Sequence, residues 1–339
     1  MILFRPVQHA DLTQLISLAE LSGPMVCTLP AQRRHLLDKI ARSVASFAED
    51  IVVPGEEIYF FVLEETETGE LLGTAAIHAQ AGFDEPFYAY RNDTVVHSSR
   101  VLGVHNRIHA LSLSHALSDH SQLCSFFILP AFRQTRLPSL LTLGRLLFIA
   151  AYPERFSESL MAVIPGVADE TGHSPFWEHV GRKFFGIEYN QAEYYNGTRS
   201  KTFIAELMPH HPLYVPLLHA DAQAVIGLVN TDAQLQFDLL TGDGFDADQY
   251  VEIFDAGPIV TARRAQLATW GMHRLAKLAH SKFKGETAHC LVLSDVAGHV
   301  SALMTDAQFD KTRILLPEPA IRALNLPPDA TVHFIPLPP

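Results

Sequence analysis

The sequence predicts an α+β protein in which helices flank a mixed central sheet and a small, β-rich and barrel-like domain follows at the C-terminus. Runs with strand periodicity and runs with helix periodicity recur along 339 residues, of which 48% are hydrophobic and 18% charged, as in ordinary globular proteins. After Gly257-Pro258 a polar stretch gives way to strand-like sequence. We therefore expect a large domain over residues 1–262, a linker over 263–285 and the small domain over 286–339.

The first elements predicted are a strand, two helices and a hairpin. Ile2 to Arg5 forms the strand, and apolar residues spaced by three and four predict helices that begin at Asp11 and that cover residues 31–49. Residues 58–65 and 71–81 read as strands on either side of a turn sequence, which is typical of a hairpin.

A strand, a basic loop and a buried helix come next in the sheet. Residues 123–129 are a continuous apolar run, the loop follows, and residues 139–151 are apolar nearly all round. Such a unit presents backbone N–H groups and the positive end of a helix dipole to phosphate. Arg133 and Arg136 lie in the loop and are candidate phosphate ligands.

The remaining elements are less regular. Residues 83–120, rich in Ser, His and aromatic residues, are expected to form an insertion that lies over the sheet. Ser174-Pro175 has the sequence of a helix start, with Ser as the N-cap and Pro at the first helical position. The other predicted elements are strands over 159–164, 203–208 and 250–254, helices over 220–229 and 232–240, and one short helix over 318–324 among the C-terminal strands.

Charge and cysteine content exclude several classes of protein. The net charge is −12 with no block of Lys or Arg, so neither nucleic acid nor an anionic membrane is an expected partner. No apolar run reaches the length of a membrane span and no signal peptide is recognisable, which predicts a cytoplasmic protein. Cys27, Cys124 and Cys290 have no CxxC spacing and are expected to be reduced core residues. No metal site is expected, because the closely spaced histidines have no nearby ligand set.

Several longer stretches of the sequence carry a resemblance to the arginine N-succinyltransferase family over nearly the whole chain. Within that family the chain is most similar to the alpha subunit of the two-subunit arginine/ornithine form. The stretches are Phe61-Val62-Leu63-Glu64, Val96-His97-Ser98-Ser99, Ser174-Pro175-Phe176-Trp177, Ala205-Glu206-Leu207-Met208-Pro209 and Ile253-Phe254-Asp255, with Gly82-Phe83-Asp84-Glu85-Pro86-Phe87-Tyr88 and His211-Pro212-Leu213-Tyr214 typical of the alpha subunit.

The resemblance implies a GNAT-like acyl-CoA N-acyltransferase core and an enzyme of amino-acid catabolism. The reaction would transfer succinyl from succinyl-CoA, as co-substrate, to the α-amine of arginine or ornithine. The chain would act in a hetero-oligomer with a related beta-type subunit or in a homo-oligomer. The family residue at the Phe126 position is associated with succinyl-CoA, although an aromatic residue there also fits a simple core role.

Two positions depart from the family pattern. The proton-donating His of the family has Asn230 in its place, in Gly227-Leu228-Val229-Asn230, and Asn cannot deliver a proton to a thiolate. The loop pattern Arg-x-x-Gly-x-Gly has Arg136 and Pro138 at its two glycines, which removes conformational freedom and a backbone donor. Two hypotheses therefore stay open: a catalytic succinyltransferase subunit, or a non-catalytic, regulatory partner with a degenerate CoA site.

Other candidates follow from the chemistry of the acceptor. His97 is a candidate proton acceptor, with a hydrogen-bonded core or rim residue as the alternative. A cationic amino acid needs carboxylates for its side chain and an arginine for its own carboxylate, and Arg91 is the candidate arginine. Asp255, which closes a strand, is also expected to form a turn. The candidate carboxylates are Asp84, Glu85, Asp169, Glu170, Glu206 and Asp255.

Overall fold

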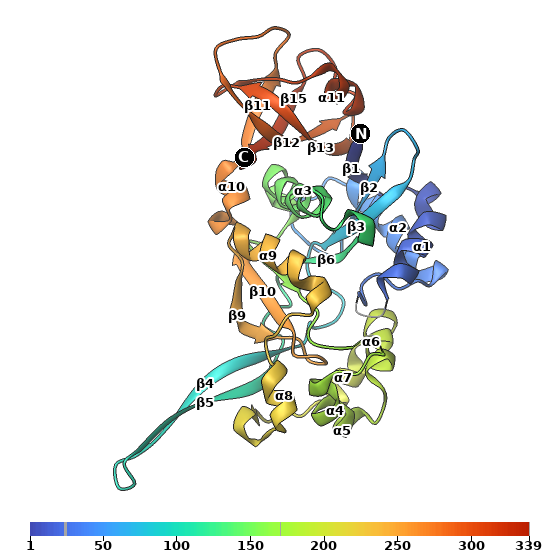
Figure 1. The fold of residues 1–339 in the computed structure, drawn as a ribbon. Coiled ribbons are helices and arrows are strands. Elements are labelled where there is room, and N and C mark those ends of the chain that lie inside the picture. The colour runs from blue at the N-terminus through green and yellow to red at the C-terminus, as the bar shows by residue number, and fades with distance from the viewer. Residues whose placement is uncertain (24–25, 170, 339) are drawn as a thin grey trace.

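One hydrogen-bonded sheet runs the length of the molecule, with a barrel at one end and a long hairpin at the other (Figure 1). The computed structural model describes residues 1–23, 26–169 and 171–338. Glu170, one of the candidate carboxylates, lies outside these ranges. The central strands are β1 (Ile2–Pro6), β2 (Ile58–Glu65), β3 (Leu71–His78), β6 (Ser121–Ile128), β7 (Ser159–Val163), β10 (Pro258–Arg263) and β9 (Asp246–Val251), in this spatial order.

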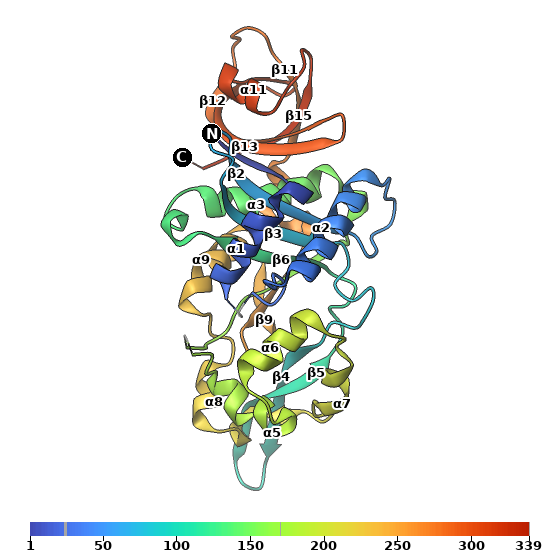
Figure 2. The same cartoon turned by 90° about the vertical axis from the view of Figure 1, so that its right-hand side faces the viewer.

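Helices cover both faces of the central sheet, as Figure 2 shows. Alternate side chains of β2 point to opposite faces. Phe60 and Val62 pack with the buried residues of α1 (Leu12–Ser22) and α2 (Arg33–Ala48), whereas Tyr59, Phe61 and Leu63 pack with α3 (Leu137–Ala151). The predicted strand, helix pair, hairpin, apolar strand and buried helix are all present, and the mixed α+β class is confirmed.

A bulge interrupts β6 and sets up an opening in the sheet. Ser125 has a φ of 51°, and the register between β3 and β6 shifts between Thr74 and Ala76. The parallel pairing of β6 with β7 covers only Ser121 to Leu123. The two strands therefore separate beyond Leu123, so that the bulged half of β6 faces an opening and not a neighbouring strand.

Residues 83–120 form a hairpin that continues the sheet. Its strands β4 (Ala89–Ser99) and β5 (Val104–Ser114) pair along their full length. β4 also pairs with β9, and β5 pairs with β8 (Leu213–Tyr214), so the hairpin extends from the sheet edge and projects away from the body (Figure 1). The expectation that this insertion lies over the sheet is therefore wrong. The backbone groups of its two strands hydrogen-bond to each other, so the insertion continues the sheet at its edge.

A lobe of short helices packs against the base of the hairpin, where Tyr90 and Leu111 share its apolar cluster. Ser174 caps the first of them, since its Oγ accepts from the Trp177 N–H at 3.3 Å, but Val180 then breaks the predicted single helix into two. The strand predicted over 203–208 is instead helical, and Ile204 and Met208 are buried one helical turn apart. The lobe consists of α4 (Pro175–His179), α5 (Gly181–Phe185), α6 (Tyr189–Thr198), α7 (Thr202–Leu207) and α8 (Ala220–Val225).

Five strands close the C-terminal barrel, because each pairs with two of the others. One of them, β11 (Arg274–Leu278), falls inside the predicted linker, which is therefore wrong for these residues. Arg274, Leu275 and Lys277 of this strand are exposed, so the sequence does not show a strand pattern clearly. Only Ala276 and Leu278 are buried. The other strands are β12 (Glu286–Val296), β13 (His299–Phe309), β14 (Arg313–Leu315) and β15 (Thr331–Pro336), and the predicted short helix is α11 (Glu318–Ala323).

The barrel and the larger domain share a core. Phe4 of β1 is in register with Ala302 of β13, and this pairing joins the barrel to the edge of the central sheet. Leu291, Leu293 and Ile335 of the barrel belong to the same apolar cluster as α3. None of the helices in the described ranges is long and apolar enough to cross a membrane.

Candidate active site

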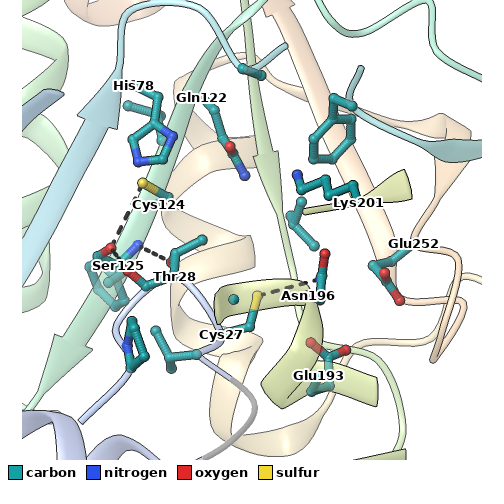
Figure 3. A pocket seen from close by; sticks show the side chains of 18 of the residues that line it. Cys27, Thr28, His78, Gln122, Cys124, Ser125, Glu193, Asn196, Lys201 and Glu252 are labelled. Atoms are coloured by element: carbon teal, nitrogen blue, oxygen red, sulfur yellow. Dashed lines mark hydrogen bonds between the residues drawn. The ribbon is translucent and has the colours of Figure 1, made fainter. Parts of the chain in front are cut away.

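A cavity of about 440 Å³ lies beside the bulge of β6. Helix α2, the end of β3, the β6 segment from Gln122 to Phe126, helix α6 and the loop after β9 supply its wall (Figure 3). A cavity of this size can hold an amino acid with part of a second ligand. It lies where β6 and β7 separate, so a ligand lying along β6 would reach it.

Lys39 and Thr28 fix the bulge. The Ser125 N–H donates to Thr28 Oγ1 at 2.9 Å and the Ser125 hydroxyl donates to the Thr28 carbonyl at 2.8 Å. Lys39 Nζ donates to the same carbonyl at 2.7 Å and to Ser125 Oγ at 2.5 Å. Burial lowers the pKa of the Lys39 ammonium group. This network holds a backbone conformation that a non-glycine residue adopts only under constraint.

A histidine and a cysteine line the same wall. His78 is opposite Gln122 in the register of β3 with β6, which brings its imidazole beside the Cys124 thiol (Figure 3). Burial raises the pKa of Cys124, but the nearby His78 and Lys39 outweigh burial and lower the pKa to about 6. All three cysteines are unpaired, yet Cys27 and Cys124 both line the cavity and are not simple core residues.

Acidic side chains line another part of the cavity. They are Glu193 of α6 and Glu252 and Asp255 of the loop after β9, and each is at most 8% exposed. The two Asp255 oxygens accept from the Gly166 and Gly257 N–H groups, each at 2.7 Å. Asp255 therefore forms the turn expected of it and also lines the cavity.

A smaller cavity of about 80 Å³ adjoins the first and shares Phe126 and Gln236 with it. Arg133 and Asn230 also line it, so three of the predicted site residues meet here. Three amides of the loop before α3 are used internally: the Arg133, Thr135 and Leu137 N–H groups donate to Pro130 O, Phe132 O and Thr135 Oγ1. An anion in this cavity would meet the Arg133 guanidinium group.

Comparison with known proteins decides the family. A family model described as arginine N-succinyltransferase beta subunit matches residues 2–269. The arginine N-succinyltransferase subunit alpha of Pseudomonas aeruginosa is 43% identical over 336 residues, with 99% of each chain covered. The arginine N-succinyltransferase of Salmonella schwarzengrund is 36% identical over 322 residues, which cover 95% of this chain and 93% of that protein. The chain belongs to the arginine N-succinyltransferase family.

A solved structure agrees with this assignment. Arginine/ornithine succinyltransferase subunit AI from Pseudomonas aeruginosa matches with a TM-score of 0.90 and 40% sequence identity, and the match covers 100% of this chain and 99% of that one. The arginine N-succinyltransferase fold, barrel included, is thus the fold of this chain.

Asn230, which was predicted to replace a histidine of the family, makes two hydrogen bonds in this arginine N-succinyltransferase chain. Its Oδ1 accepts from the Asp232 N–H at 3.0 Å, and its Nδ2 donates to Ala168 O at 3.2 Å. The side chain thus caps a short turn at the wall of the smaller cavity. Next to it, Arg133 forms an ion pair of 3.3 Å with Asp232, while Arg136 is exposed at the start of α3.

The structure separates the other predicted residues from the two cavities. His97 is exposed on the projecting hairpin, 6.5 Å from the Tyr214 ring. Arg91, also on the hairpin, pairs with Asp93 at 2.8 Å. Glu206 is exposed on α7. Glu85 accepts from the Lys201 N–H at 2.7 Å, and its hydrogen bond with Ser200 contributes first to the lowering of its pKa.

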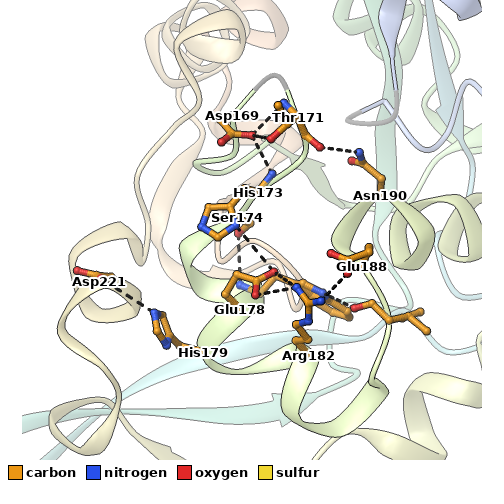
Figure 4. A network of polar contacts seen from close by, with 12 residues as sticks. Asp169, Thr171, His173, Ser174, Glu178, His179, Arg182, Glu188, Asn190 and Asp221 are labelled. Carbon is orange, nitrogen blue, oxygen red and sulfur yellow. Dashed lines mark hydrogen bonds and ion pairs between the residues drawn. The ribbon is translucent and has the colours of Figure 1, made fainter.

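Asp84 and Asp169 also lie outside these two cavities, but Asp84 and Glu85 line a third one of about 600 Å³, which adjoins the first and shares His78 and Lys201 with it. Asp84 is 3.8 Å from the Arg42 guanidinium at the surface. Asp169 Oδ1 accepts from the N–H groups of Thr171 and His173 at 2.9 Å and closes a turn (Figure 4). The same figure shows the surface pair of His179 with Asp221. With His219 they place three possible metal-ligand atoms within 4.8 Å, but His219 Nδ1 already accepts from the Asp221 N–H at 3.3 Å.

Sequence reasoning missed Lys39, His78, Cys124, Glu193 and Glu252. One signal was available: Lys39 lies on the buried stripe of α2, between Leu36 and Ser43 at helical spacing. A lysine on an apolar stripe often has a specific partner.

Proposed function

We propose that this chain is an alpha-type subunit of an arginine/ornithine N-succinyltransferase, acting in amino-acid catabolism in the cytoplasm. It transfers succinyl from succinyl-CoA to the α-amine of arginine or ornithine. The observation that carries the proposal is the cavity beside the bulge of β6, in a chain that resembles the Pseudomonas aeruginosa arginine N-succinyltransferase subunit alpha over 99% of its length. Three unpaired cysteines agree with a reducing compartment.

The donor lies along the opening between β6 and β7. Its pantetheine arm follows the bulged half of β6 past Phe126, and its phosphates meet Arg133 and Arg136 at the start of α3. Guanidinium groups suit phosphate because their paired N–H groups match two oxygens. No metal takes part in this proposal, since the thioester is reactive enough for direct attack by an amine.

The reaction joins the amine nitrogen to the thioester carbon while the carbon–sulfur bond breaks. Backbone N–H groups of β6 near Phe126 stabilise the oxyanion. His78 accepts the proton that the attacking amine loses, because it is a cavity-lining imidazole and imidazole is the group that most often accepts protons in enzymes. The amide product and the free thiol leave.

Asn230 does not prevent this reaction. A thiol of the usual kind has a pKa of about 8.5, so the thiolate can leave without a dedicated acid and takes its proton from water after the carbon–sulfur bond has broken. Asn230 instead keeps the wall of the donor cavity in place through its hydrogen bonds to Asp232 and Ala168.

A partner subunit is part of the proposal. The matching family model describes a beta subunit and the Pseudomonas relative is a subunit alpha, which supports a hetero-oligomer with a beta-type chain; a homo-oligomer is the alternative. Three amides of the loop before α3 have internal partners, which favours the second candidate function, a non-catalytic partner with a weakened CoA site.

The experiment is a thiol-release assay with succinyl-CoA and either L-arginine or L-ornithine, on the purified chain alone and with a beta-type subunit. Calorimetric titration of CoA accompanies it. Turnover by the chain alone, abolished in His78→Gln, is the expected result. CoA binding without turnover in either preparation would contradict the catalytic function and favour the regulatory one.

A further inference from the structure

Two buried carboxylates face the cavity without a cationic partner. Glu193 is 5% exposed and Glu252 is 8% exposed, and both line the cavity. Figure 3 shows both carboxylates turned toward the same part of it. They belong to different elements, α6 and the loop after β9, so the fold brings them together.

The charge around these carboxylates is unbalanced. In the described ranges no Lys or Arg nitrogen lies within 4.0 Å of Glu193, Glu252 or Asp255. Lys201 also lines the cavity and interacts electrostatically with Glu252, and burial lowers the pKa of this lysine. Burial and then the Asp255 charge raise the pKa of Glu193 to about 8. Burying like charges without a cation is unfavourable. A cationic ligand would supply the positive charge that the protein lacks at this place.

The Glu252 carboxylate is held ready for such a ligand. Its Oε2 accepts from the N–H groups of Phe254 and Asp255, at 2.5 Å and 2.9 Å. These bonds fix the direction of the carboxylate and favour its charged form, while burial and then the charges of Asp255 and Glu193 raise the pKa of Glu252 well above its usual value. Behind it, Asp255 adds a further negative charge while its own oxygens are bound by backbone amides.

We propose that Glu193 and Glu252 form the subsite for the cationic side chain of the acceptor, the guanidinium group of arginine or the ammonium group of ornithine. This inference rests on the proposed function. An extended cationic amino acid carries its α-amine and its side-chain charge at opposite ends. The cavity matches this arrangement, with His78 and Cys124 on one side and Glu193 and Glu252 on another (Figure 3).

The test uses the full chain saturated with CoA, which holds the donor site occupied without turnover. L-Arginine, L-ornithine and L-citrulline are titrated into wild type, Glu193→Gln and Glu252→Gln, with Glu20→Gln as the matched control on the exposed face of α1. L-Citrulline has the length of arginine but carries no charge. Each Gln variant should weaken L-arginine binding by about tenfold or more, while citrulline binding and CoA binding stay unchanged.

A second readout guards against misfolding. L-Arginine should raise the thermal unfolding midpoint of wild type and of Glu20→Gln but not of the two cavity variants. Unchanged arginine affinity in both cavity variants, or equal loss for arginine and citrulline, would overturn the inference. So would a fall in kcat with KM unchanged, which would make the carboxylate a proton acceptor. Failure of the proposed function is separately visible as absence of CoA binding and of thiol release in wild type.

Discussion

Lys39 Nζ donates a hydrogen bond to Ser125 Oγ at 2.5 Å and thereby connects helix α2 to the bulge of β6. The same ammonium group donates to the Thr28 carbonyl at 2.7 Å. Helix α2, the segment that precedes it and the distant strand β6 therefore meet at one charge. The bulge directs the β6 backbone toward the opening, so its geometry depends on this contact.

Replacing Lys39 should damage stability and catalysis together. Lys39→Met removes two charge-assisted hydrogen bonds, and we expect a loss of about 2–3 kcal/mol in the free energy of unfolding with a fall in kcat of at least about tenfold. Urea denaturation and the thiol-release assay measure the two effects. Arg34→Met, an exposed change on the same helix, is the control. A variant with wild-type kcat would show that the bulge holds its shape without the lysine.

Asp232 should weaken CoA binding in the native chain. It forms an ion pair of 3.3 Å with Arg133 and competes with a phosphate for this guanidinium. Asp232→Asn is therefore expected to tighten CoA binding by about two- to fivefold at low salt, in keeping with about 0.2–1 kcal/mol for an exposed pair. Arg133→Ala should loosen it, and Asp248→Asn should have no effect. Calorimetry at two salt concentrations checks the result, and weaker binding by Asp232→Asn would contradict a phosphate role for Arg133.

Cys124 should react selectively with iodoacetamide. Its pKa of about 6 makes it mostly thiolate at pH 7, whereas burial raises the pKa of Cys290 to about 12 and that of Cys27 well above its usual value. The alkylation rate should rise between pH 5 and pH 7 and fall when CoA occupies the adjoining opening. Peptide mass spectrometry identifies the site, with Cys124→Ser as the control. Equal labelling of Cys27 would argue against the contribution of His78 and Lys39.

Stability should decrease with pH because of Glu193. Burial and the charge of Asp255 raise the pKa of Glu193 from 4.5 to about 8, so the folded state binds a proton that the unfolded state releases. Its contribution to stability is complete below pH 4.5 and is lost as pH rises through about 8. Glu193→Gln should therefore exceed wild type in thermal midpoint at pH 9 and approach it at pH 5. A constant difference across this range would contradict the shift.

Much of the architecture follows from sequence periodicity. The β2–β3 hairpin and the unit of β6, loop and α3 are regular enough for alternation and helical spacing to predict them. Helix α7 was predicted as a strand because the segment around Ile204 is too short to distinguish strand alternation from helical spacing. Only the packing of Ile204 and Met208 in the core decides between the two. Strand β11 was missed because its exposed residues are mostly polar and its partners lie far away in sequence.

The site was predictable only in part. Phe126, Arg133 and Asn230 meet at one cavity, and the first two belong to a single strand-loop-helix unit that the sequence reveals. Glu193 and Glu252 lie on separate elements, and no local pattern marks a carboxylate as buried. His97 and Arg91 were chosen by resemblance and chemistry, but the pairing of β4 with β5 places them on a projecting arm.

The pairing of β1 with β13 affects how the chain can be synthesised and divided. Phe4 is among the first residues to leave the ribosome, yet its partner Ala302 is made near the end. One edge of the central sheet therefore stays open through most of synthesis, when unpaired strands readily join other chains. A fragment that ends at residue 269, where the match to the family model stops, would keep that edge open permanently and should aggregate.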